Sequence, residues 1–267
     1  MRRETATVGR KTLGYLISEP AQPAIRQRPN STVVFLHAFP LQSAMWEPNL
    51  GAMPEGWRAV APDFRWEAGA GMADLAGDVV DLLDHLQVTR AAVVGCSFGG
   101  YVAFEMVRSA PRYISALGLV STRPGADSDE GRANRMKMIE LVEREGVEAI
   151  AGQMVPKLLG ATTQRDRPDL ANHARNLILQ NTPARIKAAV TAMMERKDST
   201  PILTAIDVPA LIVHGSEDAL IPPAEAVGMS RAIRASRLEL IPSSGHLPNL
   251  EQPARFDGLL WEFLNKL

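Results

Sequence analysis

Short apolar stretches recur along the chain and alternate with segments whose apolar residues have helical spacing. Eight stretches are predicted to be strands: Thr5–Val8, Lys11–Ser18, Thr32–Leu36, Trp57–Ala61, Ala91–Cys96, Ala116–Val120, Ala210–His214 and Arg237–Ile241. Residues 75–86 and 256–263 carry apolar side chains at helical spacing and are predicted to be helices. This alternation is typical of an α/β fold, with a mainly parallel sheet flanked by helices.

Residues 123–200 interrupt the alternation. They contain several helical patterns and no convincing strand, and Gly146, Pro156, Pro168 and Pro183 punctuate these helices. We therefore expect a helical insertion at 123–200 and a core formed by residues 1–122 and 201–267. A separate helical domain is the alternative, but so short a segment inside an α/β pattern disfavours it.

Composition narrows the class of protein without identifying its activity. The chain has 267 residues, a formal net charge of −1 and 46% hydrophobic residues, all ordinary for a soluble globular protein. Nothing in this charge favours a nucleic-acid partner. The longest apolar runs fall far short of the roughly 20 residues of a membrane helix. Because the N-terminus also lacks the apolar stretch of a secretory signal, we expect a cytoplasmic protein with no membrane partner.

A single cysteine, Cys96, excludes an internal disulfide framework and a cysteine-rich metal site. We expect neither a metal nor an organic cofactor. The oligomeric state cannot be read from the sequence.

The segment from Gly95 to Gly99 reads Gly-x-Ser-x-Gly and carries the strongest chemical signal. An apolar strand precedes it and a helical pattern follows it, which is the context of a nucleophile elbow. In such a turn the central residue has a strained backbone and needs small neighbours. Ser97 is the predicted nucleophile.

A serine hydroxyl is a poor nucleophile at neutral pH and needs a base oriented by an acid. His246 lies in a loop after the last predicted strand and is the predicted base. The other four histidines are assigned to surface, packing or structural roles: His37, His85, His173 and His214.

The orienting acid is expected between nucleophile and base in the chain. Asp218, the fourth residue of Gly215-Ser216-Glu217-Asp218, follows a predicted strand and is preferred. Glu217 is the alternative, with a solvated turn position as its default. The loop after the sixth predicted strand is another location for the acid. Its first carboxylate is Asp127, which lies too far from the end of the strand to favour this location.

An oxyanion hole requires two backbone N–H groups directed at the developing charge. Phe98, directly after the nucleophile, and Phe39, in the turn after the third strand, are the predicted donors; Pro40 has no N–H. Trp46 has two open interpretations, pocket wall or core. Cys96 is expected to be a packed, buried thiol.

These residues resemble the α/β-hydrolase superfamily along the whole chain. The motifs that carry the resemblance are His37-Ala38-Phe39-Pro40, Gly95-Cys96-Ser97-Phe98-Gly99, Gly215-Ser216-Glu217-Asp218 and Gly245-His246. The resemblance implies an eight-stranded α/β-hydrolase fold with a helical cap after the sixth strand. Small esterases, 3-oxoadipate enol-lactonases and cofactor-free haloperoxidases are the most similar groups. Ala38 and Asp63-Phe64-Arg65-Trp66 depart from the usual pattern and affect loop shape.

The expected activity is hydrolysis of small to medium carboxylic esters or lactones through an acyl-enzyme on Ser97. Perhydrolysis in the same fold is an alternative, because Phe39-Pro40 resembles the oxyanion turn of the haloperoxidases. A ligand receptor with weak catalysis is an alternative from another class, which the complete set Ser97, Asp218 and His246 disfavours.

Residues 123–200 say little about the substrate. Five methionines there suit either an apolar pocket roof or plain core: Met136, Met138, Met154, Met193 and Met194. Arg135, Lys137 and Arg185 suit either a substrate carboxylate or solvated helix faces, and the solvated faces are favoured.

Overall fold

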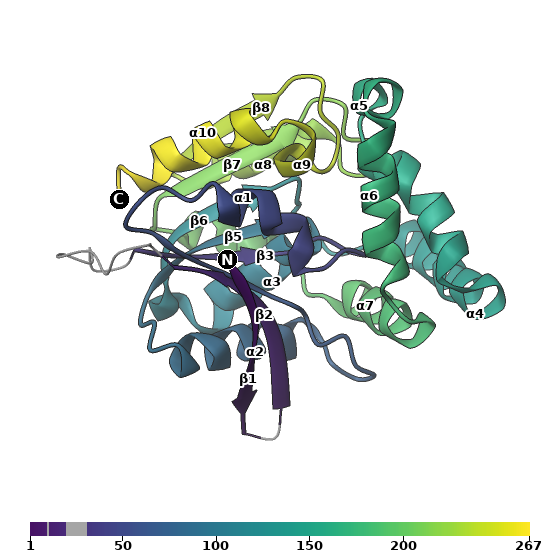
Figure 1. The fold of residues 1–267 in the computed structure, drawn as a ribbon, viewed down its shortest axis with the longest axis horizontal. Coiled ribbons are helices and arrows are strands. Elements are labelled where there is room, and N and C mark those ends of the chain that lie inside the picture. The colour runs from purple at the N-terminus through teal and green to yellow at the C-terminus, as the bar shows by residue number, and fades with distance from the viewer. Residues whose placement is uncertain (10, 20–30) are drawn as a thin grey trace.

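A computed structural model describes residues 1–9, 11–19 and 31–267 (Figure 1). Its strands are β1 Arg2–Val8, β2 Lys11–Ser18, β3 Thr32–Leu36, β4 Arg58–Pro62, β5 Ala91–Cys96, β6 Ile114–Val120, β7 Ala210–Gly215 and β8 Ser236–Ile241. They form one sheet in the order β1-β2-β4-β3-β5-β6-β7-β8. Strand β2 is antiparallel to both its neighbours, and all pairs from β4 to β8 are parallel. The predicted eight-stranded, mainly parallel sheet is confirmed.

Three strands begin earlier than their apolar patterns predict: β8 by a single residue, at Ser236, and β1 and β6 by more. Strand β1 begins at Arg2 rather than Thr5, and its first residues are largely exposed. It pairs only with β2, so its polar side chains remain in solvent. Strand β6 begins at Ile114 rather than Ala116, and its register with β5 shifts at this end. The apolar pattern therefore underestimates strand length at polar or irregular ends.

Helices cover both faces of the sheet. In the core of the fold they are η1 Ser43–Trp46, α1 Glu47–Gly51, α2 Met72–His85, α3 Phe98–Ser109, η2 Pro111–Tyr113, α8 Pro223–Ala232, α9 Pro248–Glu251 and α10 Pro253–Leu264. Figure 1 shows α1 and α10 above the sheet and α2 and α3 below it. The segments predicted as helices, 75–86 and 256–263, lie in α2 and α10.

Between β6 and β7 the chain forms a layer of helices beside the sheet (Figure 1). These are α4 Asp129–Leu158, α5 Ala161–Asp166, α6 Pro168–Leu179, α7 Pro183–Glu195 and η3 Thr200–Ala205. Gly146, at φ 77°, breaks α4 into two helical parts, while Pro168 and Pro183 occupy the first turns of α6 and α7. Pro156 lies within α4, close to its end. Residues 121–209 contribute nothing to the sheet.

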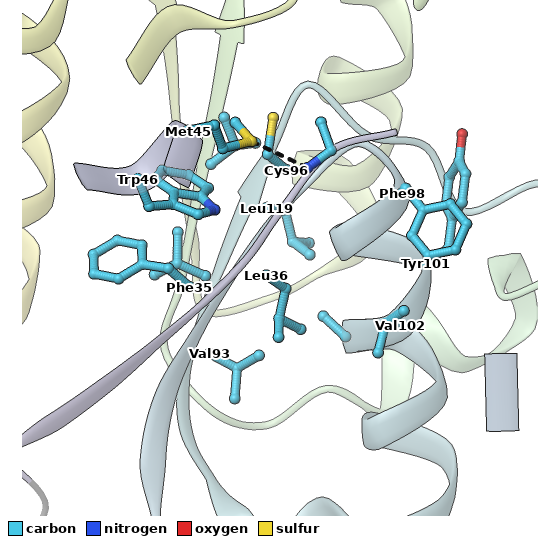
Figure 2. Packing of buried hydrophobic residues seen from close by; sticks show 14 of the residues in the cluster. Phe35, Leu36, Met45, Trp46, Val93, Cys96, Phe98, Tyr101, Val102 and Leu119 are labelled. Carbon is cyan, nitrogen blue, oxygen red and sulfur yellow. Dashed lines mark hydrogen bonds between the residues drawn. The ribbon is translucent and has the colours of Figure 1, made fainter. Parts of the chain in front are cut away.

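Aromatic and apolar side chains fill the core beneath the carboxyl ends of β3 and β5 (Figure 2). The rings of Phe35 and Trp46 lie with centroids 4.9 Å apart, and Trp46 also contacts Phe256. Trp46 is fully buried. Trp46 therefore packs in the core and does not form a wall of the pocket.

Helix α3 approaches β3 so closely that only glycine fits at the contact. A Cβ atom on Gly99 would overlap the backbone carbonyl of Leu36, and one on Gly95 would overlap the carbonyl of Gly99. Neither overlapping atom is a flexible side-chain end, so the clash cannot relax cheaply. This contact fixes the helix against the end of the strand that precedes the oxyanion turn.

We expect Gly99→Ala to lower the free energy of unfolding by about 1–3 kcal/mol, the range for overpacking in a dense core. The matched control is Gly228→Ala in α8, where a Cβ would meet nothing within 4 Å. That change should be neutral or stabilise the helix by up to about 1 kcal/mol. Urea unfolding measures both; equal stabilities for the two variants would contradict the packing argument.

Candidate active site

Four loops meet at the edge of the sheet where the parallel strands end. They follow β3, β5, β7 and β8, and they carry His37 to Pro40, Ser97, Asp218 and His246. Because parallel strands direct their carboxyl ends to one edge, residues far apart in sequence converge there. The structure thus brings together the residues that the sequence predicts as nucleophile, acid, base and amide donors.

Ser97 occupies a strained turn between β5 and α3. Its backbone has φ 51° and ψ −109°, outside the regions that residues with a side chain ordinarily adopt. Hydrogen bonds hold the turn: Ser97 N–H donates to Val120 O over 2.8 Å, and Thr122 Oγ1 donates to Ser97 O over 2.9 Å. The surroundings therefore impose the conformation, as is common at functional sites.

His246 is oriented by Asp218. Its Nδ1 lies 2.7 Å from Asp218 Oδ2, and both side chains are almost completely buried. Because the Nδ1 proton is donated to the carboxylate, Nε2 is left as the acceptor. His246 and Ser97 line the same pocket, with no hydrogen bond between them among the residues the structure describes. Such bonds are often long before substrate binds.

The Asp218 carboxylate is kept ionised by its neighbours. Burial raises its pKa, but His246 and hydrogen bonds from His214, His246 and the Ile221 N–H outweigh burial and hold the pKa well below its usual range. His214 Nε2 lies 2.8 Å from Ile221 O and 3.2 Å from Asp218 Oδ2. His214 is therefore a buried structural residue that supports the carboxylate.

Two backbone N–H groups are available as oxyanion donors. Phe98 is the first residue of α3, so its N–H has no intrahelical acceptor. The N–H of Phe39 donates to no acceptor in the described part of the chain, whereas Ala38 N–H donates to Met45 Sδ over 3.2 Å (Figure 2). A hydrogen bond from Leu41 N–H to Ala38 O closes the turn around the cis Phe39–Pro40 peptide.

His37 shapes this turn through hydrogen bonds to its backbone and to the Phe64 loop. Its Nε2 accepts from the Phe64 N–H and its Nδ1 donates to Ala38 O, each over 3.1 Å. The ring is fully buried against Phe64 and Trp66. Burial lowers the pKa of His37 to about 4, so the ring stays neutral at physiological pH.

Cys96 is fully buried, and its thiol contacts His246 O at 3.8 Å. Burial, reinforced by the negative charges of Asp218 and Glu251, raises its pKa well above the usual range for a thiol. A thiol that does not ionise is a poor nucleophile, which favours the packing role over a catalytic one.

Glu251 is a buried carboxylate beside the candidate site that the sequence interpretation missed. It is buried in α9 and accepts three backbone N–H bonds: from Gly245 and Leu247 on Oε1, at 2.9 and 3.1 Å, and from Gly160 on Oε2, at 2.8 Å. Two of these donors flank His246, and the third joins α4 to α5. Its only sequence signal is an acidic residue shortly after the predicted base His246.

Further contacts tie the helical layer to the catalytic loops. His246 N–H donates to Leu158 O over 3.1 Å. Glu217, the alternative acid, accepts hydrogen bonds from the backbone N–H and the hydroxyl of Thr162 at 2.8 and 2.6 Å. Glu217 thus holds α5 in place and does not contact His246.

A pocket of about 120 Å³ opens above Ser97. Its wall consists of Phe39, Ser97, Tyr101, Arg123, Arg135, Met138, Met154, Lys157, Met193, Leu220, Ile221 and His246. Three of the five methionines considered as a roof line it, whereas Met136 is exposed. Arg185 lies elsewhere, over the Trp66 ring with a hydrogen bond to Phe64 O. Over the described ranges, no group of three or more His, Cys, Asp or Glu side chains is placed to hold a metal ion.

Comparison with known proteins identifies the family of this chain. A sequence model of the α/β hydrolase fold matches residues 31–253. An esterase from Thermogutta terrifontis, solved with malate bound, is 33% identical over 100% of this chain and 99% of its own, with a TM-score of 0.90. The chain therefore belongs to the α/β-hydrolase family, and its relatives support a hydrolase.

Lactonases are also among the similar proteins. The 3-oxoadipate enol-lactonase 1 of Acinetobacter baylyi is 27% identical over 268 aligned residues, which cover 96% of this chain and 94% of that protein. The enol-lactonase of Burkholderia xenovorans LB400 has a TM-score of 0.87 at 23% identity, covering 98% of this chain and 100% of its own, and shows the shared fold. Of the helices described, none is long and apolar enough to cross a membrane.

Glu251→Gln should lower the free energy of unfolding by about 1–3 kcal/mol. The amide keeps one acceptor oxygen but turns an NH2 group either toward the Gly160 N–H or toward the N–H groups of Gly245 and Leu247, so one or two buried donors lose their partner. Urea unfolding measures the loss, and amide hydrogen exchange should accelerate at Gly160 or Gly245. Glu262→Gln on the exposed face of α10 is the matched control and should change stability by less than about 0.5 kcal/mol.

Stability should fall with acid through His37. In the unfolded chain the ring takes up a proton near pH 6.5, whereas the buried ring does so only near pH 4. The unfolded state therefore binds more protons across this window, and stabilisation of about 3 kcal/mol at neutral pH disappears as the pH falls from 6.5 to 4. Urea unfolding at pH 7, 5.5 and 4.5 should show this slope in the wild type. His37→Gln, which retains an acceptor for Phe64 N–H, should lack it; parallel slopes would refute the assignment.

Proposed function

We propose that the protein is a serine hydrolase of small to medium carboxylic esters or lactones, acting through an acyl-enzyme on Ser97. The observation that carries the proposal is the 2.7 Å hydrogen bond from His246 to Asp218, at the wall of a pocket that also contains Ser97. The identity to an esterase over the full chain and the likeness to a lactonase support the same chemistry.

In the first half-reaction the Ser97 oxygen bonds to the acyl carbon while His246 Nε2 takes the hydroxyl proton. The negative charge on the former carbonyl oxygen is stabilised by the N–H groups of Phe39 and Phe98. The tetrahedral intermediate then collapses, the bond to the leaving oxygen breaks, and His246 returns the proton to that oxygen. Asp218 remains ionised throughout and holds the imidazole tautomer.

In the second half-reaction water replaces the alcohol. His246 takes a proton from water as its oxygen bonds to the acyl carbon, and the Ser97 oxygen leaves with that proton. The products are a carboxylic acid and an alcohol, or a single hydroxy acid from a lactone. The pocket of about 120 Å³ is comparable to a cavity of about 150 Å³ that admits benzene. This size favours a modest acyl group.

Ser97→Ala should reduce kcat/KM for 4-nitrophenyl butyrate by at least about 10³-fold, because the nucleophile is lost. Asp218→Asn should reduce it by about 10³–10⁴-fold by favouring the wrong histidine tautomer. A fluorophosphonate should add one phosphonyl group to Ser97 in the wild type, detected by peptide mass spectrometry. Glu262→Gln, at an exposed position of α10 outside the pocket wall, is the control and should retain full activity. Wild-type turnover by Ser97→Ala would exclude the mechanism.

A further inference from the structure

The pocket above Ser97 has an unbalanced charge. Its wall carries three basic side chains, Arg123, Arg135 and Lys157, and no carboxylate. The remaining wall beside Ser97 and His246 is apolar or aromatic. In an apolar wall, a few charged groups usually fix the orientation of a ligand.

Nearby carboxylates do not neutralise these side chains. Arg123 Nη2, Arg135 Nε and Arg196 Nη1 all converge on Asp127, at 2.8, 3.2 and 2.9 Å. The Asp127 side chain is 1% exposed. One buried carboxylate therefore faces three guanidinium groups, which leaves two positive charges in excess.

The excess charge belongs to the two arginines that line the pocket. Arg196 is 3% exposed, donates to Met193 O and Gly125 O, and lies 4.3 Å above the Tyr101 ring. Its Nη groups are thus occupied, and Arg196 forms a buried pair with Asp127. The side chains of Arg123 and Arg135 are 30% and 21% exposed, on the pocket side of that pair.

Both arginines have donors left over. In the part of the chain that the structure describes, the only side-chain hydrogen bond of Arg135 is from Nε to Asp127, so both its Nη groups lack an acceptor. Arg123 Nε is buried with no partner among the same residues. Lys157, on the far part of α4, adds a third cation without a described ion pair. The ionised Asp218 carboxylate is directed at His246 and His214, and within the described ranges it forms no ion pair with these three side chains.

We propose that this pocket selects esters or lactones that carry a second, free carboxylate on the acyl part, which Arg135 and Arg123 bind, with Lys157 contributing long-range attraction. Guanidinium groups fit a carboxylate in a two-point fork. The apolar walls at Met138, Met154 and Met193 suit the methylene chain between the free carboxylate and the scissile carbonyl. The preference rests on the proposed esterase function, but the anion subsite can be tested without it.

The test compares matched substrates. Monoethyl succinate, glutarate and adipate each have a neutral, nearly isosteric partner in which the free carboxylate is a carboxamide. Hydrolysis is followed by pH-stat, and kcat/KM for the acid should exceed that for the amide by about 10- to 100-fold at one chain length or more. Arg135→Gln should reduce this ratio by at least about 10-fold with little change for the amide. Arg144→Gln is the control: it lies on the same helix, 70% exposed and outside the pocket wall, and should leave the ratio unchanged.

Binding separates the two proposals. Calorimetry with Ser97→Ala measures the dissociation constants of monoethyl adipate and ethyl adipamate without turnover, and the acid should bind about 10-fold more tightly unless Arg135→Gln is added. Equal kcat/KM for acid and amide, with Ser97-dependent hydrolysis of both, would overturn the anion subsite and leave the hydrolase intact. Arg135-dependent binding without hydrolysis of any ester would support the subsite and overturn the hydrolase. Equal binding of acid and amide would overturn the subsite in either case.

Discussion

The catalytic geometry depends on a close approach of three backbone segments around Gly245. A Cβ atom on Gly245 would overlap the backbone of Gly160 and Leu159, and one on Gly215 would overlap the carbonyls of Gly245 and Ser244. The acid loop, the histidine loop and the junction of α4 with α5 therefore touch backbone to backbone. Glu251 satisfies the amides that this contact buries. A buried N–H without a partner would be costly, so the carboxylate and the contact stabilise each other.

Ser97 and His246, the proposed nucleophile and base, are held in position by different kinds of contact. Ser97 sits between regular elements, and its strained backbone is imposed by the packing of α3 on β3 and by bonds to Val120 and Thr122. His246 sits in the loop between β8 and α9. Its position is set by a side chain, Glu251, and by the carbonyl of Leu158. The helical layer is thus part of the framework that holds the base.

Local patterns in the sequence were sufficient for the fold and for the chemistry proposed at Ser97. The strands are short apolar runs, and the elbow at Gly95–Gly99 is a local motif, although the backbone overlaps that make its glycines necessary are visible only in the structure. The charged pocket was not predictable in the same way. The sequence pattern favours a solvated helix face for Arg135 over a substrate contact. It gives no signal for Arg123 or Lys157. The proposed role of the pocket arginines depends on the convergence of three arginines on Asp127. This convergence requires α4 to lie beside α7, and that arrangement belongs to the tertiary structure and not to a local pattern.

The apolar periodicity of α4 does not predict which of its residues line the pocket, because the helix is broken. Gly146, at φ 77°, changes the direction of the chain, so the two parts of α4 bury different faces. Arg135 and Met138 line the pocket from one part, and Met154 and Lys157 line it from the other. A single apolar stripe along 30 residues is therefore absent, even though each part is ordered by its contacts. The second part also ends at Leu158, whose carbonyl accepts a hydrogen bond from the His246 amide, so Lys157 lies next to the residue that holds the proposed base. The proposed base and one cation of the proposed anion subsite thus meet at the α4–α5 junction, and a change there is expected to alter the position of His246 and the charge of the pocket together.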